Sequence, residues 1–288
     1  MAIDLHVHST SSDGTVPAGE LPAMAAAAGL SAIALTDHDT TGGLKDFLAC
    51  QERFPDVELI AGVELSSRIG VREIHIVGLF IDPDNAVLQN FMYNMRQERI
   101  TRSKAMQEKL ASSGYIVTDE ELAAIGMQQD VPGRPHFARV LAKKYNFPDT
   151  RSVFEQLLKY GGAGFVPRNL PGPEEAIKAI KSAGGVAVWA HPFHSKRNEN
   201  NFISRTIREL KFAGLDALEA YYTEYTPTKT ATALRMAKEY NLFCSGGSDF
   251  HGEVHPQTRL GSGHGTLAVP DEILVDLKKA AAPRVILV

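Results

Sequence analysis

The sequence predicts an α/β protein, a distorted (β/α)7 barrel with a helical insertion subdomain after the fourth strand. Three observations support this fold class. Seven short apolar, β-rich runs recur along the 288 residues, helical patterns lie between them, and one interval is far longer than a usual connection. The predicted strands are residues 2–8, 31–38, 57–65, 73–80, 185–192, 215–222 and 242–251.

The helical patterns between the runs have recognisable ends. Residues 17–30 close on Gly29, a residue type that commonly follows a helix. Residues 172–185 begin with acidic residues and end in two glycines, and residues 228–241 close on Asn241. Alternating strands and helices predict parallel pairing with the helices outside. Seven such units fit a barrel that lacks an eighth unit, and a doubly wound open sheet is the competing architecture.

The long interval lies between the predicted strands that end near residue 80 and begin near residue 185. It reads as a long helix over about 86–113, followed by three shorter helical segments. We therefore predict a helical insertion at 99–167 and a barrel formed by 1–98 and 168–288. In a barrel, the insertion emerges at one end of the strands, where it can act as a lid and bind substrate. A decorative subdomain or an oligomer contact is the alternative.

The composition is that of an ordinary globular protein, with 44% apolar and 22% charged residues. The net charge of −4 and the pI near 6.2 argue against binding of long nucleic acids. Two cysteines, Cys50 and Cys244, imply no disulfide framework and fit a reducing cytoplasm. We expect no signal peptide and no membrane span, since neither pattern occurs. The oligomeric state is left open.

Two histidines, His6 and His8, stand two residues apart on the first predicted strand. Side chains of a strand alternate between its faces, so both imidazoles point the same way, about 6.5 Å apart along the chain. Such a pair can bind one cation or two adjacent ones. Alone it is a weak signal, because surface histidines on an edge strand give the same pattern.

Other titratable residues strengthen the metal interpretation. Six of the seven predicted strands deliver His, Asp or Glu, mostly at or just past the carboxyl end, which is the active face of an α/β barrel. Such groups are costly at the ends of buried strands unless a metal or hydrogen bonds satisfy them. Taken alone, His75 fits a hydrogen-bonded histidine of the core as well as it fits a metal ligand. Beyond the first strand, the residues are Asp37, His38, Asp39, Glu64, His75, His191, His194, Asp249 and His251.

The motifs HVH, TDHD, GVE, EIH, AHP and SDFH, in this order, resemble the PHP (polymerase and histidinol phosphatase) domain. The resemblance covers residues 1–98 and 168–288 and implies a distorted seven-stranded barrel with two or three divalent metal ions. It further implies that His6, His8 and Asp249 bind one ion, that Glu64 bridges it to a second ion bound by His75 and His191, and that Asp13, His38 and His251 bind a third. All nine positions match, which argues against a degenerate, non-catalytic domain.

The metal is expected to be Mn²⁺, with Fe²⁺ or Zn²⁺ as alternatives. The implied ligands, imidazoles and carboxylates without thiolates, suit all three metals and do little to separate them. Within the family, the chain is most similar to small stand-alone proteins with a helical insertion after the fourth strand. That similarity implies a phosphatase of nucleotide 3′,5′-bisphosphates, or a relative that trims RNA from its 5′ end.

Charge also favours a phosphate ester as substrate. Three carboxylates bring −3 and three divalent ions would bring +6, so the cluster would be about +3 before any hydroxide binds. Arg134 and His136 flank Pro135, which is predicted in the first turn of a helix and so near a ready phosphate site. Further candidate phosphate-binding residues are Arg168, Lys196 and Arg197.

The predicted reaction is phosphomonoester hydrolysis, in which a metal-bridging hydroxide attacks the phosphorus of the 3′-phosphate and the 3′-oxygen of the nucleotide leaves. Arg134 is predicted to stabilise charge on the phosphoryl oxygens, and His194 to donate a proton to the leaving alkoxide. Arg134 and Arg168 would bind the second phosphate. The alternatives are a 5′→3′ exoribonuclease on short RNA, a histidinol-phosphate phosphatase, and a non-catalytic metal-binding module of a larger complex.

Two glycine-rich segments invite other readings. Residues 245–249 lack the lysine and the spacing of a phosphate-binding loop, so we interpret their glycines as room for the metal cluster. Residues 261–265 are predicted to form a flexible surface turn.

Overall fold

The computed structural model describes residues 2–125, 133–194 and 199–281. The chain divides into two compact units, which are treated separately. The first comprises Met1–Met92 and Pro171–Val288, and the second comprises Tyr93–Leu170. The second unit therefore begins six residues before the insertion that the sequence predicts and ends three residues after it.

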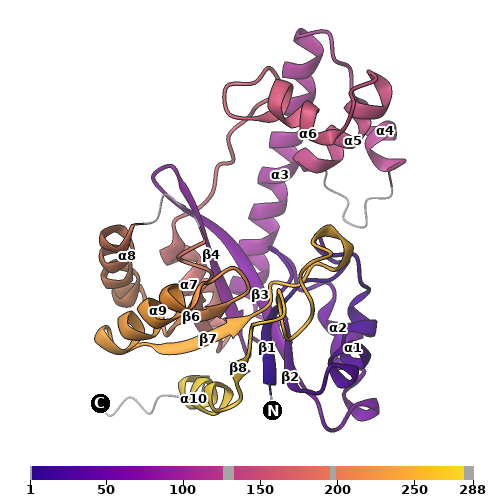
Figure 1. Cartoon of the computed structure of the whole chain (residues 1–288). Helices are drawn as coiled ribbons and strands as arrows, with labels where there is room; N and C mark the ends of the chain where they lie inside the picture. Colours follow the sequence, from indigo (N-terminus) through magenta and orange to yellow (C-terminus); the bar gives the residue numbers. More distant parts are fainter. Residues whose placement is uncertain (1, 126–132, 195–198, 282–288) are drawn as a thin grey trace. The chain divides into compact units, whose positions relative to one another are not determined.

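The first unit is a mixed α/β, nearly closed barrel (Figure 1). Its strands neighbour one another in the order β7-β6-β5-β4-β3-β2-β1-β8. A parallel bridge between Val7 and Phe250 joins the end of β1 to the residues after β7 and so brings the two sides together. The strands are β1 (Ala2–Val7), β2 (Leu30–Leu35), β3 (Glu58–Ile69), β4 (Arg72–Leu79), β5 (Val186–Trp189), β6 (Ala217–Tyr222), β7 (Phe243–Gly247) and β8 (Val269–Pro270).

The expectation of parallel pairing throughout is wrong at the fourth strand. β4 runs antiparallel to both β3 and β5. Gly70 has a φ of 58° and, with Val71, turns the chain directly from β3 into β4, so no crossover helix intervenes. Because β4 is reversed, its first half lies at the carboxyl end of the parallel strands, and His75 is brought to that end.

The helices of this unit lie against the outside of the sheet and at one end of it. In Figure 1, α1 and α2 flank β1 and β2, while α7, α8 and α9 lie beyond the other strands. The sequence analysis did not predict the helices α2, α8 and α10 or the two-residue β8, which pairs antiparallel with β1. The helices are α1 (Leu21–Ala27), α2 (Leu44–Leu48), α7 (Pro173–Ser182), α8 (Asn200–Ala213), α9 (Pro227–Glu239) and α10 (Glu272–Ala281), with short 3₁₀ segments at Ala18–Glu20, Gln51–Arg53 and Gly252–Val254.

The first unit has two apolar cores, one on the outer face of the sheet and one inside the barrel. The outer core packs strand residues such as Trp189 and Leu218 against the surrounding helices. The inner core joins small and branched strand residues to three residues of α10, and so fills the barrel at the end where the parallel strands begin. Its buried members are Ile3, Leu5, Ala32, Ala34, Ile60, Val77, Leu79, Val186, Val188, Ala190, Ala217, Val269, Leu274, Leu277 and Ala280.

β1 carries an irregularity that the strand pattern does not predict. Ile3 and Leu5 pack in the inner core, whereas Val7 packs in the outer one. The pairing of β1 with β2 shifts register between Asp4 and Val7, which changes the face that successive residues present. The side chains of Leu5 and His6 therefore both lie inside the barrel, although they are neighbours in the strand. His8 lies on the same face as His6, as predicted, since both face Glu64.

The second unit is helical. It contains most of α3 (Ala86–Ser112), then α4 (Asp119–Ala123), α5 (Arg134–Lys144) and α6 (Thr150–Val153), which continues into a π-helical turn at Phe154–Leu158. Leu110, Phe137, Leu141 and Leu158 form the centre of its own apolar core. Among the described residues of either unit, we find no helix with the length and apolarity that crossing a membrane requires.

Candidate metal centre

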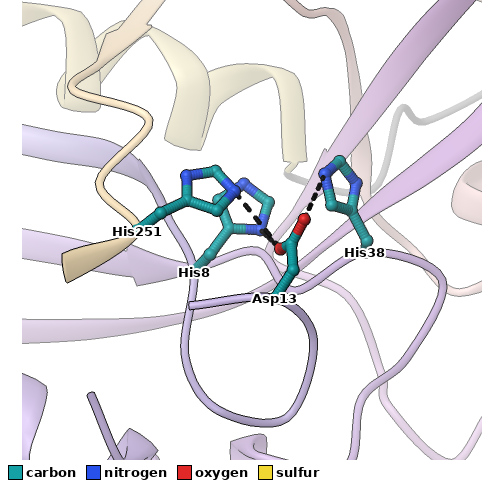
Figure 2. A group of neighbouring side chains, drawn as sticks. All are labelled: His8, Asp13, His38 and His251. Atoms are coloured by element: carbon teal, nitrogen blue, oxygen red, sulfur yellow. Dashed lines mark ion pairs between the residues drawn. The ribbon is translucent and has the colours of Figure 1, made fainter. Parts of the chain in front are cut away.

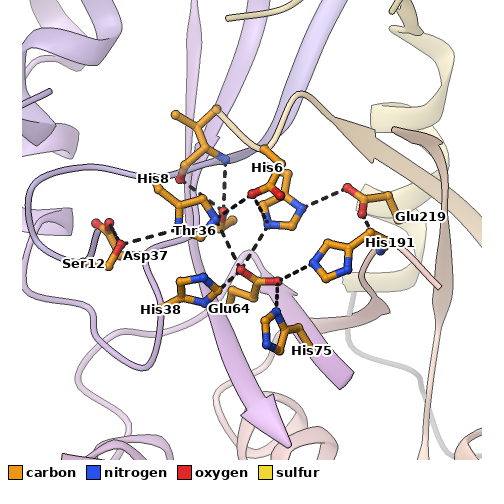
Figure 3. A network of polar contacts seen from close by, with 12 residues as sticks. His6, His8, Ser12, Thr36, Asp37, His38, Glu64, His75, His191 and Glu219 are labelled. Carbon is orange, nitrogen blue, oxygen red and sulfur yellow. Dashed lines mark hydrogen bonds and ion pairs between the residues drawn. The ribbon is translucent and has the colours of Figure 1, made fainter. Parts of the chain in front are cut away.

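Nine side chains meet at the end of the barrel where the parallel strands finish (Figures 2 and 3). β1 and the residue after it bring two of them, and the following turn brings a third. The segments after β2, β5 and β7 bring four, and β3 and β4 bring one each. They are the nine residues that the resemblance implied: His6, His8, Asp13, His38, Glu64, His75, His191, Asp249 and His251. That they bind metal stays a prediction.

Glu64 lies at the centre of the cluster and is fully buried. Its Oε1 makes hydrogen bonds with His75 Nδ1 at 3.0 Å and His191 Nε2 at 3.1 Å. Its Oε2 faces three other imidazoles, with His38 Nδ1 at 3.0 Å, His6 Nε2 at 3.2 Å and His8 Nε2 at 3.3 Å. Each carboxylate oxygen thus faces a different group of histidines, which suits a bridging ligand.

The ligand atoms converge in three overlapping groups, each compact enough to surround one ion. Figure 2 shows the first, in which Asp13 lies between His251 and His38 with His8 beside it. The second group is His6, His8, Glu64 and Asp249, and the third is His38, Glu64 and His75. His8 and His38 each belong to two groups, so the division into separate triplets that the resemblance implied is less sharp in the structure. His191 lies outside these three groups and contacts Glu64 alone among the nine through its ring nitrogen.

Several buried atoms of the cluster fit bound cations. Within the described residues, His6 Nε2, His8 Nε2, His38 Nδ1 and Glu64 Oε2 are buried without a hydrogen-bond partner. Leaving such groups unsatisfied costs about 1–3 kcal/mol each, and more when they are charged. All four atoms face one another, and imidazole nitrogen with carboxylate oxygen is a suitable donor set for Mn²⁺, Fe²⁺ or Zn²⁺.

The pKa shifts in the cluster show the same demand for positive charge. Burial alone would lower the pKa of His8, but the carboxylates of Asp249 and Glu64 raise it to about 10. Burial is likewise outweighed at His75, where Glu64 and Glu73 raise the pKa to about 10. Burial and the neighbouring imidazoles instead lower the pKa of His38 to about 4. Divalent ions would supply the charge that protons supply here, and their binding would displace those protons.

Two residues of the cluster have left-handed backbone conformations, which are unusual for residues other than glycine. His191 has a φ of 33° and Asp249 a φ of 56°. Such conformations cost of order 1–3 kcal/mol each and persist where the surroundings enforce them. The Asp249 N–H donates to the carbonyl of His6, and the phenol of Tyr222 donates to Asp249 Oδ2 at 3.0 Å. Asp249 is therefore held in place by β1 and β6, and the His191 N–H donates to Glu219 Oε2 on β6 at 2.6 Å.

The structure adds supporting residues that the sequence analysis did not single out. Glu219 of β6 lies beside His6 and His191 (Figure 3). Asp37 and Asp39, noted only as strand-end acids, each anchor a neighbouring segment. Asp37 accepts from the N–H and hydroxyl of Ser9, and Asp39 from those of Ser66. Glu219 carried a readable signal, since a carboxylate inside an apolar strand needs a partner, and β6 was the only predicted strand without a candidate.

The glycines of residues 245–249 have a more specific role than the sequence suggested. A Cβ on Gly247 would overlap the backbone nitrogen and the Cβ of His6. The glycine therefore allows β7 to approach β1 rather than making room for the ions themselves. The prediction of a flexible surface turn at 261–265 is wrong for its first and third glycines. Gly261 and Gly263 are buried, and the Gly261 N–H donates to the buried carboxylate of Asp4 at 2.7 Å.

The predicted phosphate-binding residues belong to different parts of the chain. Arg134, His136 and Arg168 lie in the second unit. α5 begins at Arg134, as predicted for a helix with Pro135 in its first turn, and His136 Nδ1 accepts a hydrogen bond from the Gly133 N–H. Lys196 and Arg197 lie outside the described residues. The binding roles of all five stay predictions.

His194 belongs to the first unit and follows the cluster residue His191. Its ring lies 5.9 Å from the His191 ring, and its side chain is 48% exposed. Its Nδ1 lies 2.7 Å from Glu224 Oε2. A proton donor at the mouth of the cluster is consistent with this placement.

Comparisons with known proteins agree with the fold and identify the family. The PHP domain family model matches residues 4–166. The chain is 34% identical over 249 residues to a 3′,5′-nucleoside bisphosphate phosphatase of Chromobacterium violaceum, which covers 86% of this chain and 87% of that protein. It is 31% identical over 252 residues to the 5′-3′ exoribonuclease Rnm of Escherichia coli, covering 86% of this chain and 84% of that protein.

Solved structures give the same result. A structure of an amidohydrolase from Chromobacterium violaceum, with bound sulfate and no metal, superposes with a TM-score of 0.81 at 31% identity, covering 97% of this chain and 96% of that one. A Bifidobacterium adolescentis protein described as a candidate metal-dependent phosphoesterase gives 0.80 at 28% identity, with 96% and 94% coverage. The fold, the cluster and these similarities define the class as a metal-dependent phosphoester hydrolase. The chain belongs to the PHP domain family.

Proposed function

We propose that this enzyme removes the 3′-phosphate from nucleoside 3′,5′-bisphosphates, using Mn²⁺. The observation that carries the proposal is the complete cluster around Glu64, whose donor atoms fit divalent ions. Similarity to a bisphosphate phosphatase over 87% of that protein's length supports the choice of substrate.

The residues of the three converging groups would hold the ions, with Glu64 shared between them. Divalent ions, when bound, supply positive charge to phosphoryl oxygens and make a water molecule more acidic. The mixed imidazole and carboxylate ligands suit Mn²⁺, Fe²⁺ or Zn²⁺, and Mn²⁺ is the ion that we propose. The centre as a whole selects an anion, because bound divalent ions would outweigh the charges of Asp13, Glu64 and Asp249.

The chain's own residues complete the proposed reaction. His194, paired with Glu224, holds a proton that the leaving 3′-oxygen requires. Arg134 and Arg168 are proposed, from the sequence, as the residues that bind phosphate oxygens, since guanidinium groups make paired hydrogen bonds with phosphate. His136, Lys196 and Arg197 are proposed as additional contacts to the substrate. The two cysteines form no disulfide, which supports the cytoplasm as the place of action.

A comparison of substrates tests the proposal directly. With Mn²⁺ present, kcat/KM for adenosine 3′,5′-bisphosphate should exceed that for 3′-AMP by about 100-fold, because the bisphosphate gains a second charged contact of about 3 kcal/mol. The nucleotide product should be 5′-AMP. Equal kcat/KM values for the two substrates, or 3′-AMP as the product, would contradict the proposal.

A 5′→3′ exoribonuclease is the second candidate function, favoured by 31% identity to a protein of that name over 84% of its length. A short RNA with a 5′-phosphate, assayed under the same conditions, separates the two. Stepwise release of nucleoside 5′-monophosphates with a higher kcat/KM than the bisphosphate would make RNA the preferred substrate. Histidinol phosphate belongs in the same panel as the third predicted alternative.

A further inference from the structure

Glu219 is a buried carboxylate on β6 to which the proposed reaction assigns no step. Its side chain lies inside the barrel, between the residue of β1 that begins the cluster and the segment after β5. Its Oε1 lies 2.9 Å from His6 Nδ1, and its Oε2 accepts the backbone N–H of His191 at 2.6 Å (Figure 3). Both of its oxygens are therefore used, and each holds a different member of the cluster.

The contact with His6 fixes the orientation of that ring. Because Nδ1 donates to Glu219, Nε2 is the nitrogen left to face the cluster, where it lies 3.2 Å from Glu64 Oε2 and 3.5 Å from Asp249 Oδ1. Histidines that bind metals usually donate their other ring N–H to such a carboxylate. The pairing selects the tautomer that a metal requires at Nε2.

The contact with His191 acts on the backbone instead. His191 has a φ of 33°, a conformation that costs free energy in a residue with a side chain. A hydrogen bond from its N–H to a buried carboxylate helps to offset that cost. The bond holds His191 where its Nε2 reaches Glu64 Oε1 at 3.1 Å.

We propose that Glu219 is the positioning residue for the His6 and His191 side of the metal centre. The proposal rests on metal binding by the cluster, not on the identity of the substrate. The opposite side has a different support. Asp37 accepts from the Ser9 N–H at 2.8 Å and from the Ser12 hydroxyl at 2.5 Å, and so holds the turn that presents Asp13. The two sides of the centre should therefore respond to separate substitutions.

Glu219→Gln and Asp37→Asn form the matched pair that tests this division. Each substitution preserves side-chain size but replaces one accepting oxygen by an N–H₂ group. Glu219→Gln therefore loses one of its two bonds, and Asp37→Asn loses one of the two oxygens that accept three bonds from Ser9 and Ser12. Crystals of each purified full-length variant would be equilibrated with a series of Mn²⁺ concentrations, and site occupancy measured by anomalous scattering. Mn²⁺ per chain would be measured in solution in parallel.

Glu219→Gln should raise the Mn²⁺ concentration for half-occupancy about 10- to 100-fold at the position next to His6 and His191. Occupancy between Asp13, His38 and His251 should stay unchanged, and Asp37→Asn should give the reverse pattern. Wild-type affinity at every position in Glu219→Gln would overturn the proposal. Equal weakening of all positions by both variants would overturn it too, since a merely structural role predicts that result.

These measurements use no substrate, so they are independent of the substrate assignment. If the two variants show the expected occupancy patterns but the wild-type enzyme does not prefer the bisphosphate, the proposed function is rejected and the role of Glu219 stands. If Glu219→Gln does not fold, Glu219→Asp provides the second test, because it keeps both acceptors but shortens their reach. It should weaken Mn²⁺ binding on the same side only.

Discussion

His251 Nε2 lies 3.2 Å from Asp13 Oδ1, which joins the turn after the first strand of the barrel to the segment after the seventh. Asp13 also faces His38 Nε2 at 3.8 Å (Figure 2). Its carboxylate thus joins the first of the three groups, which we call the outer group: His8, Asp13, His38 and His251. Glu64 belongs to the other two groups and not to this one.

Replacement of Asp13 should affect this outer group selectively. Asp13→Ala should weaken Mn²⁺ binding between His38 and His251 by at least about 100-fold, the upper range for loss of a residue that merely supports a ligand. The ions next to His6 and His75 should remain, because Glu64 holds that side. Metal analysis of the dialysed protein checks this. Loss of all bound Mn²⁺ would contradict the division, and Asp46→Ala, on the helix α2, is the control that should retain every ion.

Replacement of Asp249 should separate catalysis from folding. Asp249→Asn keeps a residue type that tolerates the left-handed φ of 56°, and keeps an acceptor for the Tyr222 hydroxyl. The folded barrel should therefore persist, while kcat/KM falls by about 100-fold or more because a charged ligand is lost. Circular dichroism and phosphate release measure the two effects. Unchanged phosphate release would contradict the role proposed for Asp249, whereas a folded wild-type protein that releases no phosphate would favour a non-catalytic metal-binding module.

The close approach of β7 to β1 should make Gly247 intolerant of any side chain. Gly247→Ala would place a methyl group against the backbone of His6 and should cost about 1–3 kcal/mol of unfolding free energy. Urea denaturation measures the difference. Gly19→Ala is the matched control, because a Cβ there would meet only the carbonyl oxygen of Asp46 at 3.7 Å. Equal stability of the two variants would contradict this account.

Removal of metal by a chelator should make stability fall as the pH rises. The pKa of His8 and of His75 is about 10 beside the carboxylates, compared with about 6.5 in an unfolded chain. Protonation of these imidazoles therefore stabilises the fold fully below pH 6.5, and the contribution is lost as the pH rises through about 10. Thermal unfolding in EDTA between pH 6.5 and 10 measures the effect.

The matched variant for that experiment is His75→Gln. Its stability in EDTA should decline less steeply with pH than that of the wild-type protein, because one titrating group is gone. Saturation with Mn²⁺ should tighten over the same range, since each ion competes with protons for the imidazoles. A flat or rising stability across this range in the chelated wild-type protein would contradict the charge balance described for the cluster.

Much of the site could be read from the sequence because most of its residues stand at or just past strand ends. The period of a strand places His6 and His8 on one face, and the shared active end of a barrel gathers Glu64, His191 and Asp249. The family resemblance supplied the grouping, which no spacing rule could give. The structure places all nine residues together, although their metal binding awaits measurement.

The features that the sequence did not predict depend on backbone geometry. β4 is reversed because a two-residue turn joins it to β3, where the alternation of strands and helices suggested a crossover. The register shift in β1 leaves no pattern in the sequence. The role of Glu219 depends on which strands become neighbours across the barrel. The mistaken surface turn at 261–265 shows the same limit, because the bond from Gly261 to Asp4 joins residues far apart in the chain.

The helix α10 limits the side from which substrate can reach the cluster. Leu274, Leu277 and Ala280 fill the barrel beneath the ligands, so the described interior is solid on the side away from the strand ends. Substrate must then arrive, and both products depart, on the side of the strand ends. Inorganic phosphate would occupy the same cluster as the substrate's phosphate, so it should act as a competitive inhibitor.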